Sequence, residues 1–202
     1  MKSLITNTWE KPYDALIQDI ACVLDDIFSK PECGNMARLA VLAIYQCLTQ
    51  EVKRFEGKSI WAKEKALSTR AEDQRIWDLE VLSSDGLLFE AVLVHSAPIR
   101  LELVKNTESI LHNSSVDRVY LLSTVATTTK ELILIGRETE RINSTCGYEV
   151  IIGGVIPTIE YFLRSLRDTN EFIESYVNLL DGDKSIKFEH QQRWNELIER
   201  LG

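Results

Sequence analysis

The sequence lacks any apolar run as long as the ~18–20 residues that a membrane-spanning helix requires, so we do not expect an integral membrane protein. Its first residues contain no uninterrupted apolar stretch either, and we therefore expect no secretory signal. Only four cysteines are present in 202 residues, and no two have the spacing Cys-x-x-Cys. This scarcity excludes a disulfide scaffold and argues against a metal cluster, so we expect reduced thiols in a cytoplasmic protein. The four are Cys22, Cys33, Cys47 and Cys146.

Positive charge is also scarce. The chain has 23 Lys and Arg against 31 Asp and Glu, a formal net charge of −8. A protein that binds DNA by itself usually carries a basic face, because neutralising phosphates supplies most of the affinity. Any contact with DNA must therefore come from a local patch or from a partner subunit. The one basic stretch begins at residue 53 and is diluted by acidic residues, so it is either a solvated loop or a phosphate-binding segment. Its candidate DNA-binding residues are Lys63, Lys65, Arg70 and Arg75.

What is present is an average globular composition, 45% hydrophobic and 27% charged, in a chain long enough for one domain with a real core. Apolar residues recur every three or four positions in some segments, which predicts helices, and alternate or run together in others, which predicts strands. An Asp-Gly turn at 85–86 predicts a hairpin. We expect strands over 76–82, 87–95, 117–124 and 147–153, and helices over 13–28, 35–54, 99–112, 127–143, from 157 to 181, and around Trp194.

This order of elements predicts the fold class. A strand pair followed by a crossover helix and a further strand requires a mixed sheet flanked by helices. We therefore expect an α/β fold with a mixed central sheet flanked by helices. The expected organisation is one domain in three segments: an N-terminal helical segment over 1–56, an α/β core over 57–156, and C-terminal helices over 157–202.

The hairpin carries the candidate chemical site. Asp78 and Glu80 are two residues apart, so they project from the same face of a strand. Leu93 and His95 share a face of the next strand, and Glu90 points the opposite way. A hydrolytic metal site needs carboxylates that converge on one Mg²⁺, and adjacent strands hold groups ~5 Å apart. The hairpin is therefore a suitable frame for metal-dependent hydrolysis.

Three runs of the sequence carry a family resemblance: WDLEV at 77–81, DGLLFEAVLVH at 85–95 and PI at 98–99. Together they resemble the nuclease core of type II restriction endonucleases that accompany DNA cytosine-5 methyltransferases, within the PD-(D/E)xK superfamily. The likeness spans most of the chain from about residue 39 onward. It implies a restriction-endonuclease-like core, Mg²⁺-dependent cleavage of DNA and, in many members, a dimer. Its further runs are DRVYLLST at 117–124, GYEVIIGGV at 147–155, PTIEYFLR at 157–164, EH at 189–190 and WNEL at 194–197.

The departures from this family's pattern concern the chemistry. Asp78 matches the first metal-binding aspartate, but Leu93 stands at the second acidic position and His95 at the position of the catalytic lysine. The glycine that usually precedes the aspartate is Trp77. An aliphatic side chain cannot bind a cation, and imidazole is a softer ligand than Mg²⁺ prefers. The resemblance therefore implies a retained scaffold from which two of three chemical groups are missing.

Our main hypothesis is a catalytically degenerate relative of these enzymes in a DNA restriction or phage-defence system, which acts by binding a partner or DNA. The expected partner is an active nuclease, a methyltransferase or another defence subunit, with a homodimer as a further expectation and no cofactor. In it, Asp78 and Glu80 are hydrogen-bonded or solvated relics. One alternative is an active endonuclease with a rearranged site of Asp78, Glu80 and His95 that binds Mg²⁺, Mn²⁺ or Zn²⁺. Another is an acidic, immunity-type inhibitor that occupies the DNA channel of a related nuclease.

Overall fold

The structure, a computed structural model, describes residues 16–30, 34–63, 76–111 and 115–198. Within these ranges the chain forms two compact units. Of the described residues, the helical unit comprises 16–30, 34–56 and 156–198, and the sheet unit comprises 57–63, 76–111 and 115–155. The organisation that we predict from the sequence, one domain in three consecutive segments, stays a prediction.

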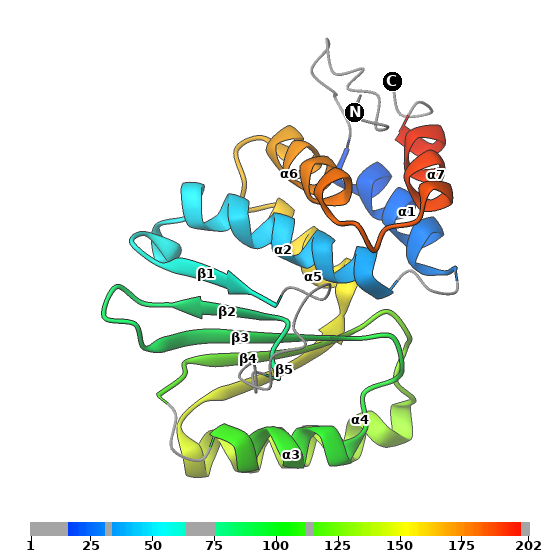
Figure 1. Ribbon diagram of the computed structural model, residues 1–202. Coiled ribbons are helices and arrows are strands. Elements are labelled where there is room, and N and C mark those ends of the chain that lie inside the picture. Colours follow the sequence, from blue (N-terminus) through cyan, green and yellow to red (C-terminus); the bar gives the residue numbers. More distant parts are fainter. Residues whose placement is uncertain (1–15, 31–33, 64–75, 112–114, 199–202) are drawn as a thin grey trace. The chain divides into compact units, whose positions relative to one another are not determined.

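The sheet unit contains a mixed sheet, shown in Figure 1. In the described part of the chain, five strands pair in the order β1-β2-β3-β4-β5. The pairs β1–β2 and β2–β3 are antiparallel, whereas β3–β4 and β4–β5 are parallel. The predicted α/β class with a mixed sheet is therefore confirmed. The strands are β1 (Ser59–Ala62), β2 (Leu79–Leu82), β3 (Leu88–His95), β4 (Arg118–Ser123) and β5 (Glu149–Gly154).

Two helices cover one face of this sheet (Figure 1): α3 (Leu101–Leu111), which links β3 to β4, and α4 (Thr129–Cys146), which links β4 to β5. Parallel neighbours require such crossover connections. Alternate residues of the strands face the helices and form one apolar core with them. Its buried residues are Trp77, Ala91, Ile99, Val104, Leu111, Val116, Val119, Leu121, Ile135, Ile142, Tyr148 and Val150.

The helical unit is built around long-range helix pairs. Helix α2 packs against α6, and α1 packs against α7 and α2. Aromatic side chains fill its interior, where Tyr176 of α6 stands edge-on to Trp194 of α7 with ring centroids 4.9 Å apart. The elements are α1 (Ile17–Phe28), α2 (Gly34–Glu51), the short 3₁₀ helix η1 (Lys53–Phe55), α5 (Val155–Leu163), α6 (Thr169–Gly182) and α7 (Phe188–Ile198).

Two sequence-based expectations were wrong. The basic stretch after residue 52 contains a strand, β1, in place of a loop, because Ser59–Ala62 adds to the free edge of β2. The single helix expected from 157 to 181 is two helices. The second begins afresh at its N-cap, Asp168, whose side chain accepts a hydrogen bond of 2.8 Å from the backbone N–H of Asn170.

Among the described residues, none of the helices combines the length and apolar character that crossing a bilayer needs. Cys22, Cys47 and Cys146 carry free thiols, and Cys33 lies outside the described residues.

Candidate functional site

Asp78 lies at the edge of the sheet unit where β2 begins. Its backbone N–H donates to the carbonyl of Val92 in β3 at 2.9 Å, and its own carbonyl accepts from the N–H of Lys63 at 3.0 Å. Lys63 directly follows β1, so Asp78 is held between the strands on both sides. The structure therefore places the candidate aspartate beside the stretch of β3 that contains Leu93.

The register decides which side chains share a face. Glu80 pairs with Ala91, and Val81 pairs with Glu90. Because side chains alternate along a strand, Glu80 lies on the same face as Ala91, Leu93 and His95, while Glu90 projects from the opposite face. The hydrogen bond between Lys63 and Asp78 extends the β1–β2 pairing by one residue, to the bend that precedes β2. For Glu80 and Glu90 this arrangement agrees with the alternation that the sequence predicts.

The carboxylate of Asp78 has a structural contact. Its Oδ2 accepts a hydrogen bond of 2.8 Å from the backbone N–H of Val94. This N–H belongs to β3 just past the point where β2 starts, and the side chain serves as its acceptor in place of a neighbouring strand. A partly buried N–H without an acceptor costs free energy of folding. The carboxylate therefore stabilises this end of the pairing between β2 and β3.

We predict that Asp78→Ala lowers the free energy of unfolding by about 1–2 kcal/mol, because a hydrogen bond to a charged acceptor is lost. Asp78→Asn keeps an acceptor oxygen and should lose less. The measurement is urea unfolding followed by circular dichroism. The matched control is Asp117→Ala, which removes an exposed carboxylate just before β4. Equal, small losses for both alanine variants would show that the contact with Val94 contributes nothing.

The other two family positions lack groups for metal chemistry. Leu93 is partly buried and packs against the apolar core beneath α3 and α4. His95 ends β3, where its carbonyl accepts from the N–H of Thr124 at 3.0 Å. Within the described ranges, no three His, Cys, Asp or Glu side chains come together as metal ligands. Asp78, Glu80 and His95 therefore do not gather into the three-ligand site of the rearranged-site alternative, and this donor set does not fit Mg²⁺.

Glu90 is fully buried on the opposite face, directly across from Arg118 in the β3–β4 register. Burial, together with the charge of Glu90, raises the pKa of the nearby Tyr120. Arg118 also forms an ion pair of 2.9 Å with Glu149 on β5. Glu90 thus belongs to a charged and aromatic cluster across the starts of the parallel strands, and cannot replace the missing second acid.

Of the candidate DNA-binding residues, the structure describes Lys63, beside Asp78. Lys65, Arg70 and Arg75 lie outside the described residues, so their grouping stays a prediction. Sequence reasoning missed the pairing of Lys63 with Asp78 because it missed β1. The β-branched and aromatic residues of Ser59–Ala62, directly after Gly57 and Lys58, were the signal available.

Comparisons of the sequence with protein-family models and with curated proteins find no match.

Proposed function

We propose that this chain is a catalytically degenerate nuclease-fold protein of a DNA restriction or phage-defence system, which acts in the cytoplasm by binding a protein partner or DNA. One observation carries the proposal. Asp78 lies beside Leu93 on the neighbouring strand β3, which ends two residues later at His95, and its carboxylate is bonded to the Val94 N–H. In the family that the sequence resembles, the second acid and the lysine stand at these two β3 positions.

Chemistry supports an inactive site. Hydrolysis of a phosphodiester by a single Mg²⁺ needs several oxygen ligands and a cationic or basic group that positions the attacking water. Leu93 offers no ligand atom and instead packs in the core. His95 supplies an imidazole in place of an ammonium group, and imidazole suits softer metals. At the three positions that the family uses, this chain therefore supplies one carboxylate, Asp78, where the chemistry needs a set.

Charge favours a protein over free DNA as the partner. The net charge of −8 repels the phosphate backbone, which supplies most of the affinity in DNA binding. The same charge attracts a basic protein surface and steers its approach. It also suits the alternative of an inhibitor that occupies the DNA channel of a related nuclease.

We predict that the purified protein leaves plasmid DNA intact in the presence of Mg²⁺, Mn²⁺ or Zn²⁺, each tested in turn by gel electrophoresis. Loss of hydrolytic groups costs several orders of magnitude in rate, so no product should exceed that of a mock purification. Metal-dependent cutting that disappears in Asp78→Ala would overturn the proposal.

The binding part of the proposal is tested in the native host. An affinity-tagged copy should co-purify with a nuclease, a methyltransferase or another subunit of the same defence system. A gel shift with duplex DNA, titrated with salt, tests the DNA route, because phosphate contacts weaken steeply as salt rises. A protein that retains none of these partners and shifts no DNA would contradict the proposed role.

A further inference from the structure

An exposed thiol lies where α4 ends. Cys146 is the last residue of this helix, which packs beside α3 on one face of the sheet (Figure 1). Its Sγ donates a hydrogen bond to Oε1 of Glu108 on α3, with 3.7 Å between the two atoms. A carboxylate within hydrogen-bond reach of a thiol can take its proton, so Cys146 has the base that a sulfur nucleophile needs.

A guanidinium group holds this carboxylate in place. Arg141 of α4 forms ion pairs with Oε2 of Glu108 and with Oε1 of Glu138, the latter at 2.9 Å. Glu108 is thus tied to α4 through one oxygen and accepts from the thiol through the other. The positive charge of Arg141 also offsets the carboxylate, whose charge alone would oppose the loss of a proton from the thiol.

The same cluster contains a buried hydroxyl without a partner. Tyr148, two residues after α4, is 3% exposed and packs in the apolar core of the sheet unit, and its Oη makes no hydrogen bond to any described residue. Burial raises the pKa of Tyr148 to about 12, and the charges of Cys146 and Glu108 add to this rise, whereas Arg141 opposes it. The hydroxyl therefore lies near all three groups. A buried O–H without an acceptor is unfavourable, so an oxygen added here would gain a hydrogen bond.

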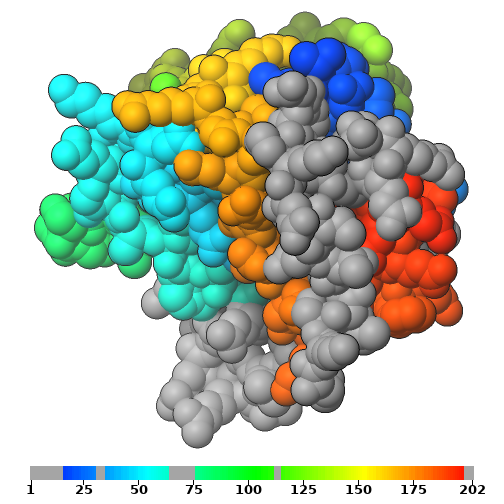
Figure 2. Space-filling view, turned by 90° about the horizontal axis from the view of Figure 1, so that it is seen from above, coloured from blue at the N-terminus to red at the C-terminus, as the bar shows by residue number. Residues whose placement is uncertain are grey.

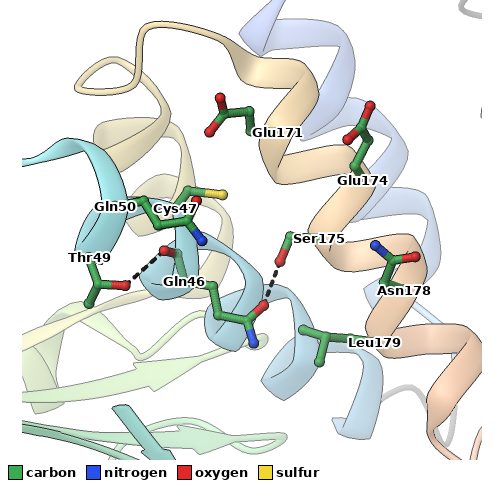
Figure 3. Close-up of a pocket in the computed structure, with 9 residues that line it drawn as sticks. All are labelled: Gln46, Cys47, Thr49, Gln50, Glu171, Glu174, Ser175, Asn178 and Leu179. Carbon is green, nitrogen blue, oxygen red and sulfur yellow. Dashed lines mark hydrogen bonds between the residues drawn. The ribbon is translucent and has the colours of Figure 1, made fainter. Parts of the chain in front are cut away.

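The other thiols in the described part of the chain lack such surroundings. Cys47 is buried in α2, beside the groove between α2 and α6 (Figure 3). Burial raises the pKa of its thiol to about 12, and the charges of Glu171 and Glu51 add to the effect, so this thiol stays protonated. Cys22 is exposed on α1, the helix whose atoms reach the surface in blue in Figure 2, but it has no hydrogen-bond partner among the described residues. Cys22 is therefore an exposed thiol without a base.

We propose that Cys146 is an oxidation site, where hydrogen peroxide converts the thiol to a sulfenic acid. The thiol passes its proton to Glu108, and the sulfur attacks one peroxide oxygen. The S–O bond forms as the O–O bond breaks, and the departing hydroxide takes up the proton and leaves as water. Sulfur loses two electrons, and the peroxide gains them. The new oxygen accepts the hydrogen bond that the Tyr148 hydroxyl lacks in the reduced protein. This oxidation does not depend on the function proposed above.

The probe is hydrogen peroxide, added to the purified full-length protein together with dimedone, which traps sulfenic acids. Peptide mass spectrometry then gives a labelling rate for each cysteine. We expect Cys146 to be labelled at least about tenfold faster than Cys22, because only Cys146 has a neighbouring base. Equal labelling rates at the two cysteines would overturn the proposal.

Two tyrosine variants test the role of the buried hydroxyl. Tyr148→Phe removes only its oxygen and should slow peroxide labelling of Cys146 by about threefold to tenfold, the usual effect of one hydrogen bond. Tyr161→Phe removes a hydroxyl from an exposed side chain of α5 and should change nothing. Alkylation of Cys146 by iodoacetamide places no oxygen on the sulfur, so its rate should be the same in Tyr148→Phe and in the wild type. Wild-type peroxide labelling in Tyr148→Phe, or an equal slowing of alkylation, would each contradict the proposal.

Discussion

The double substitution Leu93→Glu with His95→Lys should give this protein Mg²⁺-dependent DNA nuclease activity. Leu93 lies beside Asp78 on the adjacent strand, where neighbouring side chains are ~5 Å apart, close enough for two carboxylates to share one cation. His95 is two residues further along the same face. Asp78 uses only Oδ2 in its bond to Val94, which leaves Oδ1 for the ion. Because hydrolytic groups contribute several orders of magnitude, nicking of a plasmid should rise from background to a readily measured rate.

Controls separate this outcome from contamination and from misfolding. The same double substitution in an Asp78→Ala background should be silent, and each single substitution should remain inactive, since each leaves one group missing. Leu93 packs against the apolar core, so Leu93→Glu lowers stability, and circular dichroism must verify that the variant is folded. A folded double variant that still leaves plasmid intact would show that restoring the second acid and the lysine is not sufficient. It would contradict the idea that these two side chains are all that the chain lacks.

The sequence predicts the parts of the fold that depend on local pattern. The long apolar run of β3 and the Asp-Gly turn before it are strong signals, and both elements formed where expected. The four-residue strand β1 carries little pattern of its own and exists because β2 has a free edge. The break between α5 and α6 was hidden because apolar residues keep a helical period across it, while the capping signal at Asp168 is a single residue.

The candidate site likewise has features that the local pattern predicts and features that depend on contacts between distant residues. Which face Glu80 and Glu90 occupy follows from alternation alone, and the register agrees with it. The hydrogen bond from the Val94 N–H to Asp78 could not be predicted, because it depends on where β2 starts relative to β3. The hydrogen bond between Gln46 of α2 and Ser175 of α6 was equally hidden. Gln46 and Ser175 are 129 residues apart, and no local pattern links them.

The largest stability effect is expected in the helical unit, for Trp194→Ala. Trp194 is only 1% exposed and stands edge-on to Tyr176. Tyr176 in turn stacks on Phe172 with ring centroids 6.0 Å apart, and its hydroxyl donates to the carbonyl of Met36 at 3.2 Å. Removing the indole leaves a cavity beside the aromatic rings of α6. We expect a loss of about 3–5 kcal/mol in the free energy of unfolding, measured by urea titration with far-UV circular dichroism.

Phe188→Ala is the matched control, because Phe188 is an aromatic residue of the same helix that is 56% exposed. Its removal should cost no more than about 0.5 kcal/mol, as for other surface substitutions. Trp194→Phe keeps a ring against Tyr176 and should fall between the two. If Trp194→Ala cost no more than Phe188→Ala, the contact between α6 and α7 would not be part of the core.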